Sequence, residues 1–409
     1  MTIILLVVLI AVGAAATVLS RVLSTNTASS SETYPLFSSG ILNVCDANGK
    51  WGYINKNGEY AINPQFDDAF PFCEGLAVIV SGEKYGFINT KGEYVITAQF
   101  DFAYSFSEGL AAVKSGDKYG YINTKGEYVI NPQFDSADSF NEELAAVKSD
   151  EKYGFIDTKG KFIINPQFDS ADSFSEGLAA VKSGEKYGFV DTKGKFIINP
   201  QFDSAQSFSE GLVAVKSGEK YGFIDTKGKF IINPQFDFAQ SFSEGLAAVK
   251  SGDKYGYINT KGKYVINPQF DDANYFREGL ARVRLSKQYG YINTKGEYVV
   301  NPQFGSADNF CMDGYAIIAT KDKKYDIIDK SGASLGFAFQ KMGYHRFGIC
   351  IASGCYNEFP LWDNHTHCYE HQTKSTSSSS SGRYCQAYGC YNKVYSSYKK
   401  YCSKHSYLE

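Results

Sequence analysis

Residues 152–185 read KYGFIDTKGKFIINPQFDSADSFSEGLAAVKSGE, and this 34-residue unit recurs along most of the chain. Its aromatic–glycine pair starts as Trp51-Gly52. The pair returns as Tyr-Gly with the same period at Tyr85, Tyr119, Tyr153, Tyr187, Tyr221, Tyr255 and Tyr289. After a step of 36 residues it degenerates to Tyr325-Asp326. A fixed period of this length is the sequence signature of a repeat architecture.

The unit predicts three β-strands joined by tight turns. Residues 153–157, 161–165 and 178–182 are rich in aromatic and β-branched side chains and are bounded by turn residues. Residues 157–160 (Asp-Thr-Lys-Gly) predict a type I turn whose glycine has a positive φ. Residues 183–186 (Ser-Gly-Glu-Lys) predict a type II′ hairpin that leads into the next copy. We therefore expect a three-stranded antiparallel meander that crosses the repeat boundary.

The connector between the second and third strands, residues 167–177, predicts a single helical turn. Phe168, Ala171 and Phe174 recur in the regular copies at a spacing of three residues. This spacing places them on one face of a short turn. We therefore expect these three side chains to belong to the core.

The arrangement of the repeats has two possible forms. The fourth, fifth and sixth copies are almost identical, which indicates recent duplication and a copy number that can change. Propeller blades usually need four strands in about 40 or more residues. The sequence therefore favours an all-β, open superhelical stack in which each unit is stabilised by its neighbours. A closed propeller-like ring is the alternative.

The motif Trp51-Gly52-Tyr53-Ile54-Asn55, followed by Pro-Gln-Phe-Asp and Glu-Gly-Leu-Ala, resembles the WG-repeat (KWG) family of bacterial proteins. The resemblance covers roughly residues 40–339. One departure is that tryptophan stands only at Trp51, whereas the other copies carry tyrosine, which keeps a large amphipathic ring. The resemblance implies a β-rich repeat module with no established common chemistry.

The N-terminal segment predicts a membrane anchor. Residues 2–19 carry no charge, and as a helix they would span roughly 27 Å. Because no basic leader precedes them, we expect an uncleaved transmembrane helix within residues 1–23, with a cleaved signal peptide as the alternative. By the positive-inside rule, Arg21 places the body in the cytoplasm, with an extracytoplasmic body as the alternative. Residues 24–39, rich in Ser and Thr, predict a flexible linker.

The C-terminal segment predicts two small zinc modules, residues 340–374 and 382–409, joined by a Ser-rich linker at 375–381. Each module carries three cysteines and one histidine in similar spacing, which suits a closed tetrahedral zinc shell. The expected ligands of these two structural Zn²⁺ ions are Cys350, Cys355, Cys368, His371, Cys385, Cys390, Cys402 and His405. Three disulfides are the alternative. Against disulfides, Cys45, Cys73 and Cys311 bring the total to an odd nine.

Composition and motifs argue against several classes of function. The net charge of −3 provides no general attraction for nucleic acid, although the second zinc module is locally basic. No histidine occurs in the repeats, and their acidic residues recur in every copy, as structural caps would. We therefore expect a non-catalytic, membrane-tethered scaffold for protein–protein interaction. The alternative is an extracytoplasmic cell-envelope protein that binds carbohydrate through exposed aromatics.

Two connector positions vary among otherwise uniform copies. The position of Ser170 is aromatic in two copies, and that of Asp172 is also aromatic in two copies, one of which has an aromatic residue at both positions. Such variation indicates solvent-facing side chains, and simple drift of an unconstrained surface is one explanation. The other is a recognition strip with aromatic anchors of the kind that dominate binding energy. Its expected partner-binding residues are Phe70, Phe102, Tyr104 and Phe238.

Overall fold

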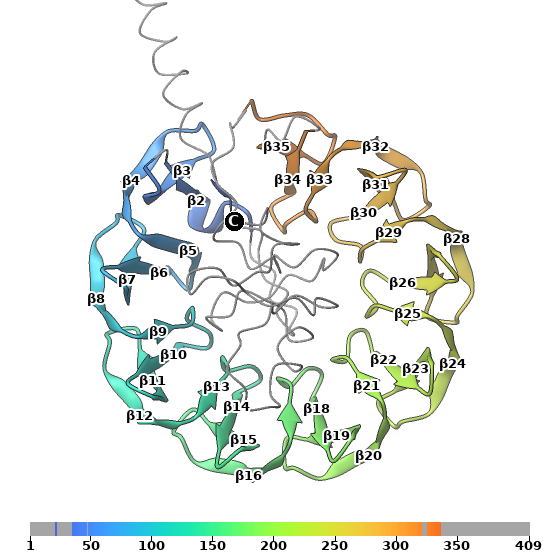
Figure 1. Ribbon diagram of the computed structural model, residues 1–409, viewed down its shortest axis with the longest axis horizontal. Helices are drawn as coiled ribbons and strands as arrows, with labels where there is room; N and C mark the ends of the chain where they lie inside the picture. The colour runs from blue at the N-terminus through green and yellow to red at the C-terminus, as the bar shows by residue number, and fades with distance from the viewer. Residues whose placement is uncertain (1–20, 23–34, 47, 321–324, 337–409) are drawn as a thin grey trace, which may run out of the picture. The chain divides into compact units, whose positions relative to one another are not determined.

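The computed structural model describes residues 21–22, 35–46, 48–320 and 325–336, and all of them belong to one compact unit. Within these residues the strands form nine separate sheets. Figure 1 shows the sheets as successive blades around a common axis, from the first in blue to the ninth in orange. The described part of the chain is therefore a nine-bladed β-propeller.

Eight blades contain four antiparallel strands in chain order, and the ninth contains three within the described residues. The strands of blades 1 to 5 are β1 (Arg21–Val22), β2 (Ile41–Cys45), β3 (Trp51–Asn55), β4 (Tyr60–Phe66); β5 (Asp68–Cys73), β6 (Leu76–Ser81), β7 (Lys84–Asn89), β8 (Tyr94–Phe100); β9 (Phe102–Ala103), β10 (Leu110–Ser115), β11 (Lys118–Asn123), β12 (Tyr128–Phe134); β13 (Ser136–Ala137), β14 (Leu144–Ser149), β15 (Lys152–Asp157), β16 (Phe162–Phe168); and β17 (Ser170–Ala171), β18 (Leu178–Ser183), β19 (Lys186–Asp191), β20 (Phe196–Phe202).

The strands of blades 6 to 9 are β21 (Ser204–Ala205), β22 (Leu212–Ser217), β23 (Lys220–Asp225), β24 (Phe230–Phe236); β25 (Phe238–Ala239), β26 (Leu246–Ser251), β27 (Lys254–Asn259), β28 (Tyr264–Phe270); β29 (Asp272–Ala273), β30 (Leu280–Leu285), β31 (Gln288–Asn293), β32 (Tyr298–Phe304); and β33 (Ser306–Ala307), β34 (Tyr315–Ala319), β35 (Tyr325–Asp329). A short 3₁₀ turn, η1 (Ser38–Gly40), precedes β2.

Each full blade has four strands, which corrects the expected three-stranded repeat; the strand that was not expected is the first of the blade. In the fifth blade, Ser170 and Ala171 of β17 pair with Lys182 and Val181 of β18. This strand has only two residues, so it leaves no alternation in the sequence, yet it completes the blade within 34 residues. The outermost strands, such as β16 and β20, line the rim of the ring (Figure 1).

The glycine of the aromatic–glycine motif is required by a close approach of two backbones. At Gly188 a Cβ would lie 2.6 Å from both Ile198 O and Pro200 N, because β20 bulges over β19 at this point. A contact this short to backbone atoms leaves no room for a side chain. The motif therefore fixes the packing of the outer strand on the third strand.

The turn between the third and fourth strands forms as predicted. In the fourth blade, Gly160 has φ +81° and its N–H donates to Asp157 O at 2.9 Å. The Asp157 carboxylate accepts the N–H of Lys159 and Lys161 at 3.0 and 2.9 Å. A Cβ at Gly160 would also lie 3.1 Å from Ile130 of the preceding blade. Glycine therefore serves both the turn and the packing between blades.

The hairpin turn between the second and third strands takes two forms. At the predicted turn, residues 183–186, only the first central residue, Gly184, has a positive φ (+65°), which agrees with the predicted type II′. The equivalent turn of blade 2 differs. Gly82 and Glu83 both have positive φ values, +59° and +64°. Two positive φ values define a type I′ turn, whose twist matches that of the flanking strands. Positive φ also occurs at Asp150 and Glu151, where glycine is missing.

The core lies between neighbouring blades. In one cluster, Leu144 and Phe155 of blade 4 pack with Phe174 and Val181 of blade 5. The expected core residues Phe168, Ala171 and Phe174 are 1, 8 and 0% exposed, which confirms that prediction. Their connector is not a helical turn, however. It runs as β17 and then, without regular secondary structure, to the bridge between Ser175 and Leu178.

The ends of the repeat body meet, which makes the open superhelical stack wrong. Leu36, Phe37 and Leu42 of blade 1 share a buried cluster with Ile317 and Ile327 of blade 9. The Asp313 carboxylate also accepts the N–H of Leu36 and of Phe37, at 3.0 and 2.9 Å. The alternative of a closed ring is therefore the observed arrangement.

The expected transmembrane helix is not part of the fold that the structure describes. Among the described residues, no helix is long and apolar enough to cross a membrane. Arg21–Val22, at the end of the expected anchor, form strand β1 and pair with β2. Residues 1–20 lie outside the described part of the chain.

Candidate functional site

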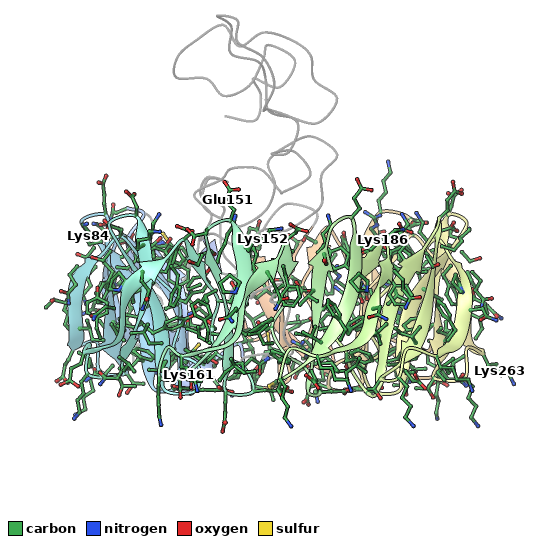
Figure 2. All side chains as sticks on the ribbon, turned by 90° about the horizontal axis from the view of Figure 1, so that it is seen from below. Lys84, Glu151, Lys152, Lys161, Lys186 and Lys263 are labelled. Atoms are coloured by element: carbon green, nitrogen blue, oxygen red, sulfur yellow. The ribbon has the colours of Figure 1, made fainter. Side chains whose placement is uncertain are left out.

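The two faces of the propeller carry different turns. Figure 2 shows Lys84, Lys152 and Lys186 on the side of the hairpins between second and third strands, which we name the upper face. Lys161 and Lys263 extend from the opposite side, the lower face, where the turns between third and fourth strands lie. Candidate surfaces can therefore be assigned to the upper face, the lower face or the junctions between blades.

Three of the four expected partner-binding residues lie in blades 2 and 3. Phe102 begins β9, and its ring centroid lies 5.0 Å from that of Tyr85 in blade 2 and 6.3 Å from that of Tyr119 in blade 3. Tyr104 contacts Phe102 at 5.0 Å. Phe70 packs against the buried cluster between blades 2 and 3. The rings of Tyr85, Phe102, Tyr104 and Tyr119 are all partly buried. They therefore pack between the blades and also face solvent.

The fourth expected residue, Phe238, lies in blade 7, apart from the other three (Figure 1). Its ring lies between Tyr221 of blade 6 and Tyr255 of its own blade, at centroid distances of 5.6 and 6.3 Å. Phe102 and Phe238 thus occupy the same place in two different junctions. The structure brings Phe102 and Tyr104 together but does not join all four residues into one patch.

A ring of lysine–aspartate pairs on the upper face links consecutive blades. The first pair joins Lys50 to Asp67 at 2.7 Å. In blade 4, Lys152 pairs with Asp169, whose carboxylate also accepts the N–H of Gly184 at 2.7 Å. The hydrogen bond from Lys152 lowers the pKa of Asp169. Seven consecutive blades carry this pair among the described residues: Lys50–Asp67, Lys84–Asp101, Lys118–Asp135, Lys152–Asp169, Lys186–Asp203, Lys220–Asp237 and Lys254–Asp271.

These pairs were missed by the sequence reasoning, although a signal existed. Lysine and aspartate recur 17 residues apart, and in blade 8 both are replaced, by Gln288 and Gly305. Joint loss of both partners is the pattern expected of an interacting pair.

A second ring of contacts lies on the lower face, at the loops that precede the second strands. The Glu176 carboxylate accepts the N–H of Gly211 in the next blade at 2.9 Å. Glu176 itself has φ +55°, a strained value for a residue with a side chain. The Ser175 hydroxyl donates to Phe208 O at 2.9 Å, also across the junction. The recurring acid at this position is therefore an inter-blade cap.

The connectors of blades 4 to 7 carry polar side chains at the junctions. Burial, with the Asp172 charge second, raises the pKa of Asp138 to about 7, and burial raises that of Asp172 to about 6. At the same position in blade 6, Gln206 donates to Ala239 O at 3.2 Å and accepts from the Ser241 hydroxyl at 2.9 Å. The Gln206 amide is therefore hydrogen-bonded at the position where Asp138 and Asp172 place a desolvated carboxylate.

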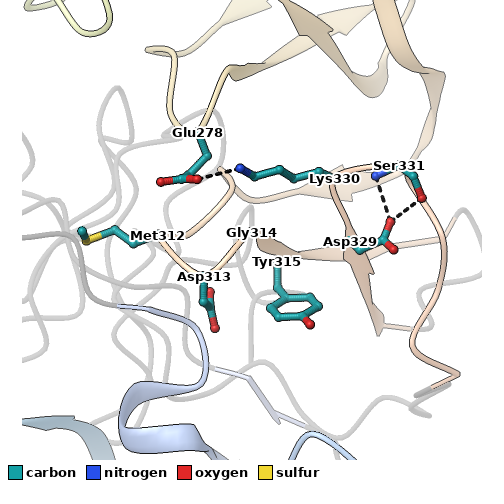
Figure 3. Close-up of a pocket in the computed structure, with 8 residues that line it drawn as sticks. All are labelled: Glu278, Met312, Asp313, Gly314, Tyr315, Asp329, Lys330 and Ser331. Carbon is teal, nitrogen blue, oxygen red and sulfur yellow. Dashed lines mark hydrogen bonds and ion pairs between the residues drawn. The ribbon is translucent and has the colours of Figure 1, made fainter.

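A recess of about 370 Å³ is lined by residues of blades 8 and 9 (Figure 3). Lys330 pairs with Glu278 at 2.6 Å, and Asp329 accepts the Ser331 hydroxyl at 2.6 Å. Asp313 is bonded to backbone N–H groups of blade 1. The charged groups that line the recess are therefore engaged within the fold.

The expected zinc ligands, from Cys350 to His405, lie outside the described residues. Within the described ranges, no group of three or more His, Cys, Asp or Glu side chains could hold a metal ion. Cys45, Cys73 and Cys311 are buried and form no disulfide. The metal prediction therefore concerns only the C-terminal segment.

The topology and repeat pattern define the class of protein as a nine-bladed propeller built from one recurring unit. The family model described as "WG containing repeat" matches eight consecutive units, at residues 51–85, 85–119, 119–153, 153–187, 187–221, 221–255, 255–287 and 289–325. The chain therefore belongs to the WG-repeat family, as the motif indicated. No curated protein matches the sequence.

Among the solved structures that match, the initiation-factor structure shows a likeness of fold only. The structure titled "Crystal structure of the eukaryotic initiation factor" is 13% identical, with a TM-score of 0.51, and covers 71% of this chain and 95% of its own. BamB from Moraxella catarrhalis is 11% identical, with a TM-score of 0.41, over 72% of this chain and 95% of its own. A streptogramin B lyase structure is 15% identical, with a TM-score of 0.32, over 58% and 93%. Identity this low carries no function across.

Proposed function

We propose that this WG-repeat propeller is a non-catalytic scaffold that binds other proteins. The observation that carries the proposal is that the acids recurring in each unit have structural partners. Asp157 caps a turn, Asp169 pairs with Lys152, and Glu176 caps the next blade. What differs between units is the set of exposed and half-buried side chains on the faces and rim. Surface variation on a rigid repeat frame suits recognition better than chemistry.

The first experiment tests the scaffold role directly. The tagged full chain is crosslinked in its source cells, a co-purifying protein is identified by mass spectrometry, and the purified pair is measured by biolayer interferometry. We expect saturable binding. A full chain that retains no protein above a tag-only control would overturn the scaffold proposal.

The aromatic residues have a matched test within the chain. Phe102→Ser and Phe238→Ser install the residue that Ser136, Ser170 and Ser204 supply in other blades. If these rings anchor the partner, the double variant binds it at least about tenfold more weakly, equivalent to about 1.4 kcal/mol. Unchanged affinity assigns the rings to blade packing alone.

We also propose that the C-terminal modules each bind one structural Zn²⁺ through their Cys₃His sets. Three thiolates and an imidazole fill a tetrahedral shell, and binding would stabilise the folded module. Elemental analysis of the full chain should give two zinc ions, and Cys385→Ser with Cys402→Ser should leave one. Three disulfides without zinc would contradict this.

Membrane attachment rests on the sequence alone. The uncharged run at residues 2–19 supports it, and that run lies outside the described residues. A chain lacking residues 1–20, which keeps β1, should partition into the aqueous fraction while the full chain sediments with membranes. Equal partitioning of the two would refute the tether.

A further inference from the structure

The turns between third and fourth strands fall into two groups. In blades 1, 2, 3 and 8 an asparagine at the first turn position donates to a glutamate at the fifth, as Asn123 does to Glu127 at 2.8 Å. The equivalent pairs are Asn55–Glu59, Asn89–Glu93 and Asn293–Glu297. In blades 4 to 7 the fifth position is lysine instead. The chain therefore changes the charge of this turn in one block of consecutive blades.

The lysine group presents cations without partners. Two lysines stand in each of these four turns, and all eight are exposed: Lys159, Lys161, Lys193, Lys195, Lys227, Lys229, Lys261 and Lys263. Among the described residues none of them forms an ion pair. The nearest acid in sequence, Asp157 in blade 4, has its carboxylate bonded to backbone N–H groups of its own turn. We name these eight residues the lysine arc.

The lysine arc adjoins exposed apolar side chains on the rim. Figure 2 shows Lys161 and Lys263 extending from the lower face, and Figure 1 shows their blades as consecutive, from green to yellow. Two residues after the last lysine of each turn, the outer strand exposes a β-branched side chain. These are Ile163, Ile197, Ile231 and Val265, which are 39, 40, 43 and 45% exposed. Each of the four blades thus offers two cations beside one apolar contact.

We propose that the lysine arc and its adjoining apolar residues bind an extended acidic segment of a partner protein. This inference rests on the proposed scaffold function and names the partner's chemistry. An extended chain can follow the curved rim and meet the same cation pair at each blade step. Its acidic side chains complement the lysines, and its apolar side chains complement Ile163, Ile197 and Ile231.

Two other polyanions fit the surface less well. A flat anionic membrane would also approach the inner acids of the lower face, such as Glu176 and Glu210, which are exposed. Binding of single-stranded nucleic acid is favoured by exposed aromatic rings, on which the bases stack. At the rim those rings, Tyr94, Tyr128 and Tyr298, lie in the glutamate-bearing blades and not beside the lysine arc.

The chain supplies a matched variant for the test. Asp157→Asn with Lys161→Glu converts the turn of blade 4 into Asn-Thr-Lys-Gly-Glu, which residues 123–127 already carry in blade 3. The equivalent changes in blades 5 to 7 are Asp191→Asn, Lys195→Glu, Asp225→Asn, Lys229→Glu and Lys263→Glu. The reverse variant, Asn89→Asp, Glu93→Lys, Asn123→Asp and Glu127→Lys, extends the arc into blades 2 and 3. Because each turn exists in the chain, the unfolding midpoint should be preserved.

Fluorescence anisotropy with a labelled poly-glutamate peptide measures binding to the full chain and both variants. We expect the converted chain to bind at least about tenfold more weakly, the extended arc to bind more tightly, and added salt to weaken binding. Equal affinity of all three chains would overturn the inference. So would tighter competition by phosphatidylserine vesicles or by duplex RNA than by unlabelled peptide. If the chain with all seven substitutions does not fold, the same comparison is made with the extended-arc variant and with variants that convert one turn at a time.

The partner from the crosslinking experiment separates this inference from the scaffold proposal. If that partner binds the natural and converted chains equally, the lysine arc is wrong and the scaffold stands. If no partner is found but poly-glutamate discriminates the variants, the scaffold proposal fails while the arc remains an acidic-peptide site.

Discussion

The regular junctions of blades 4 to 7 and the closing junction between blades 9 and 1 solve the same problem with different chemistry. A regular junction uses a glutamate cap, as from Glu176 to Gly211 N, and a lysine–aspartate pair. The closing junction uses Asp313, which caps two successive N–H groups at Leu36 and Phe37. Lys56 adds a cation–π contact, 4.7 Å from the ring of Tyr315. Identical repeats make identical junctions, but the two chain ends must meet through residues outside that pattern.

Blade 8 shows the change beginning before the closing junction. It lacks the lysine–aspartate pair, and Arg282 stands where blades 2 to 7 carry alanine or valine. Arg282 donates to Ala307 O in blade 9 at 2.8 Å. Blade 8 therefore exchanges a surface ion pair for a half-buried bond to the last blade.

Removal of one regular blade should have the largest effect. With residues 186–219 deleted, every remaining regular junction still matches in sequence, but eight blades cannot keep both those junctions and the Asp313 contact unstrained. We expect a loss of stability on the order of 5 kcal/mol, the scale of a buried apolar cluster. Urea unfolding measures it, with a Gly-Ser insertion in the exposed turn at residues 183–186 as control. An unchanged midpoint and a shorter rod by small-angle scattering would argue for an open stack.

Local features of the blade could be predicted from sequence, whereas closure could not. The turn at Gly160 and the core position of Phe174 follow from a few adjacent residues that repeat. The two-residue strand β17 is too short to show alternation. The cluster that joins Phe37 to Ile317 lies across nearly the whole body and has no periodic signal. The lysine–aspartate pairs could have been predicted from the sequence, because both partners change together in blade 8.

The closing cap should matter more than a regular cap. Asp313→Ala leaves two partly buried N–H groups without a charged acceptor, so we expect a loss of about 3 kcal/mol. Glu176→Ala removes one exposed cap, for an expected loss below about 1 kcal/mol. Urea unfolding compares the two, and Asp313→Asn, which keeps one acceptor oxygen, should fall between them. Equal losses would mean that the closing junction is no more critical than the others.

The junction carboxylates predict an unusual dependence of stability on pH. Burial raises the pKa of Asp138 to about 7, so between the unfolded-state value and pH 7 the folded chain binds a proton that the unfolded chain releases. Stability should therefore fall as pH rises from the unfolded-state value to about 7, and level off above it. Asp138→Asn should remove this fall and stabilise the chain at pH 8 by up to about 2 kcal/mol, after allowance for partial exposure.

The measurement is the urea midpoint from pH 5 to pH 8. Asp172→Asn should act in the same direction, but the fall in stability that it removes should end at a lower pH, because the pKa of Asp172 is about 6. Asp203→Asn should instead lower the urea midpoint equally from pH 5 to pH 8, because the hydrogen bond that Asp203 accepts from Lys186 lowers the pKa of Asp203 and its contribution is lost only at lower pH. Parallel pH profiles for the natural chain and Asp138→Asn would refute the assignment.

Restoring the missing ion pair in blade 8 should have the smallest effect. Gln288→Lys with Gly305→Asp recreates the arrangement of Lys254 and Asp271, whose side chains are 45 and 32% exposed. An exposed pair contributes roughly 0.2–1 kcal/mol, and less in high salt. A double-mutant cycle of unfolding free energies should therefore give a small favourable coupling that disappears in concentrated salt, while neither single change stabilises the chain. A coupling well above 1 kcal/mol would mean that the upper ring is a main source of stability, and that the regular junctions depend on charge more than on their buried clusters.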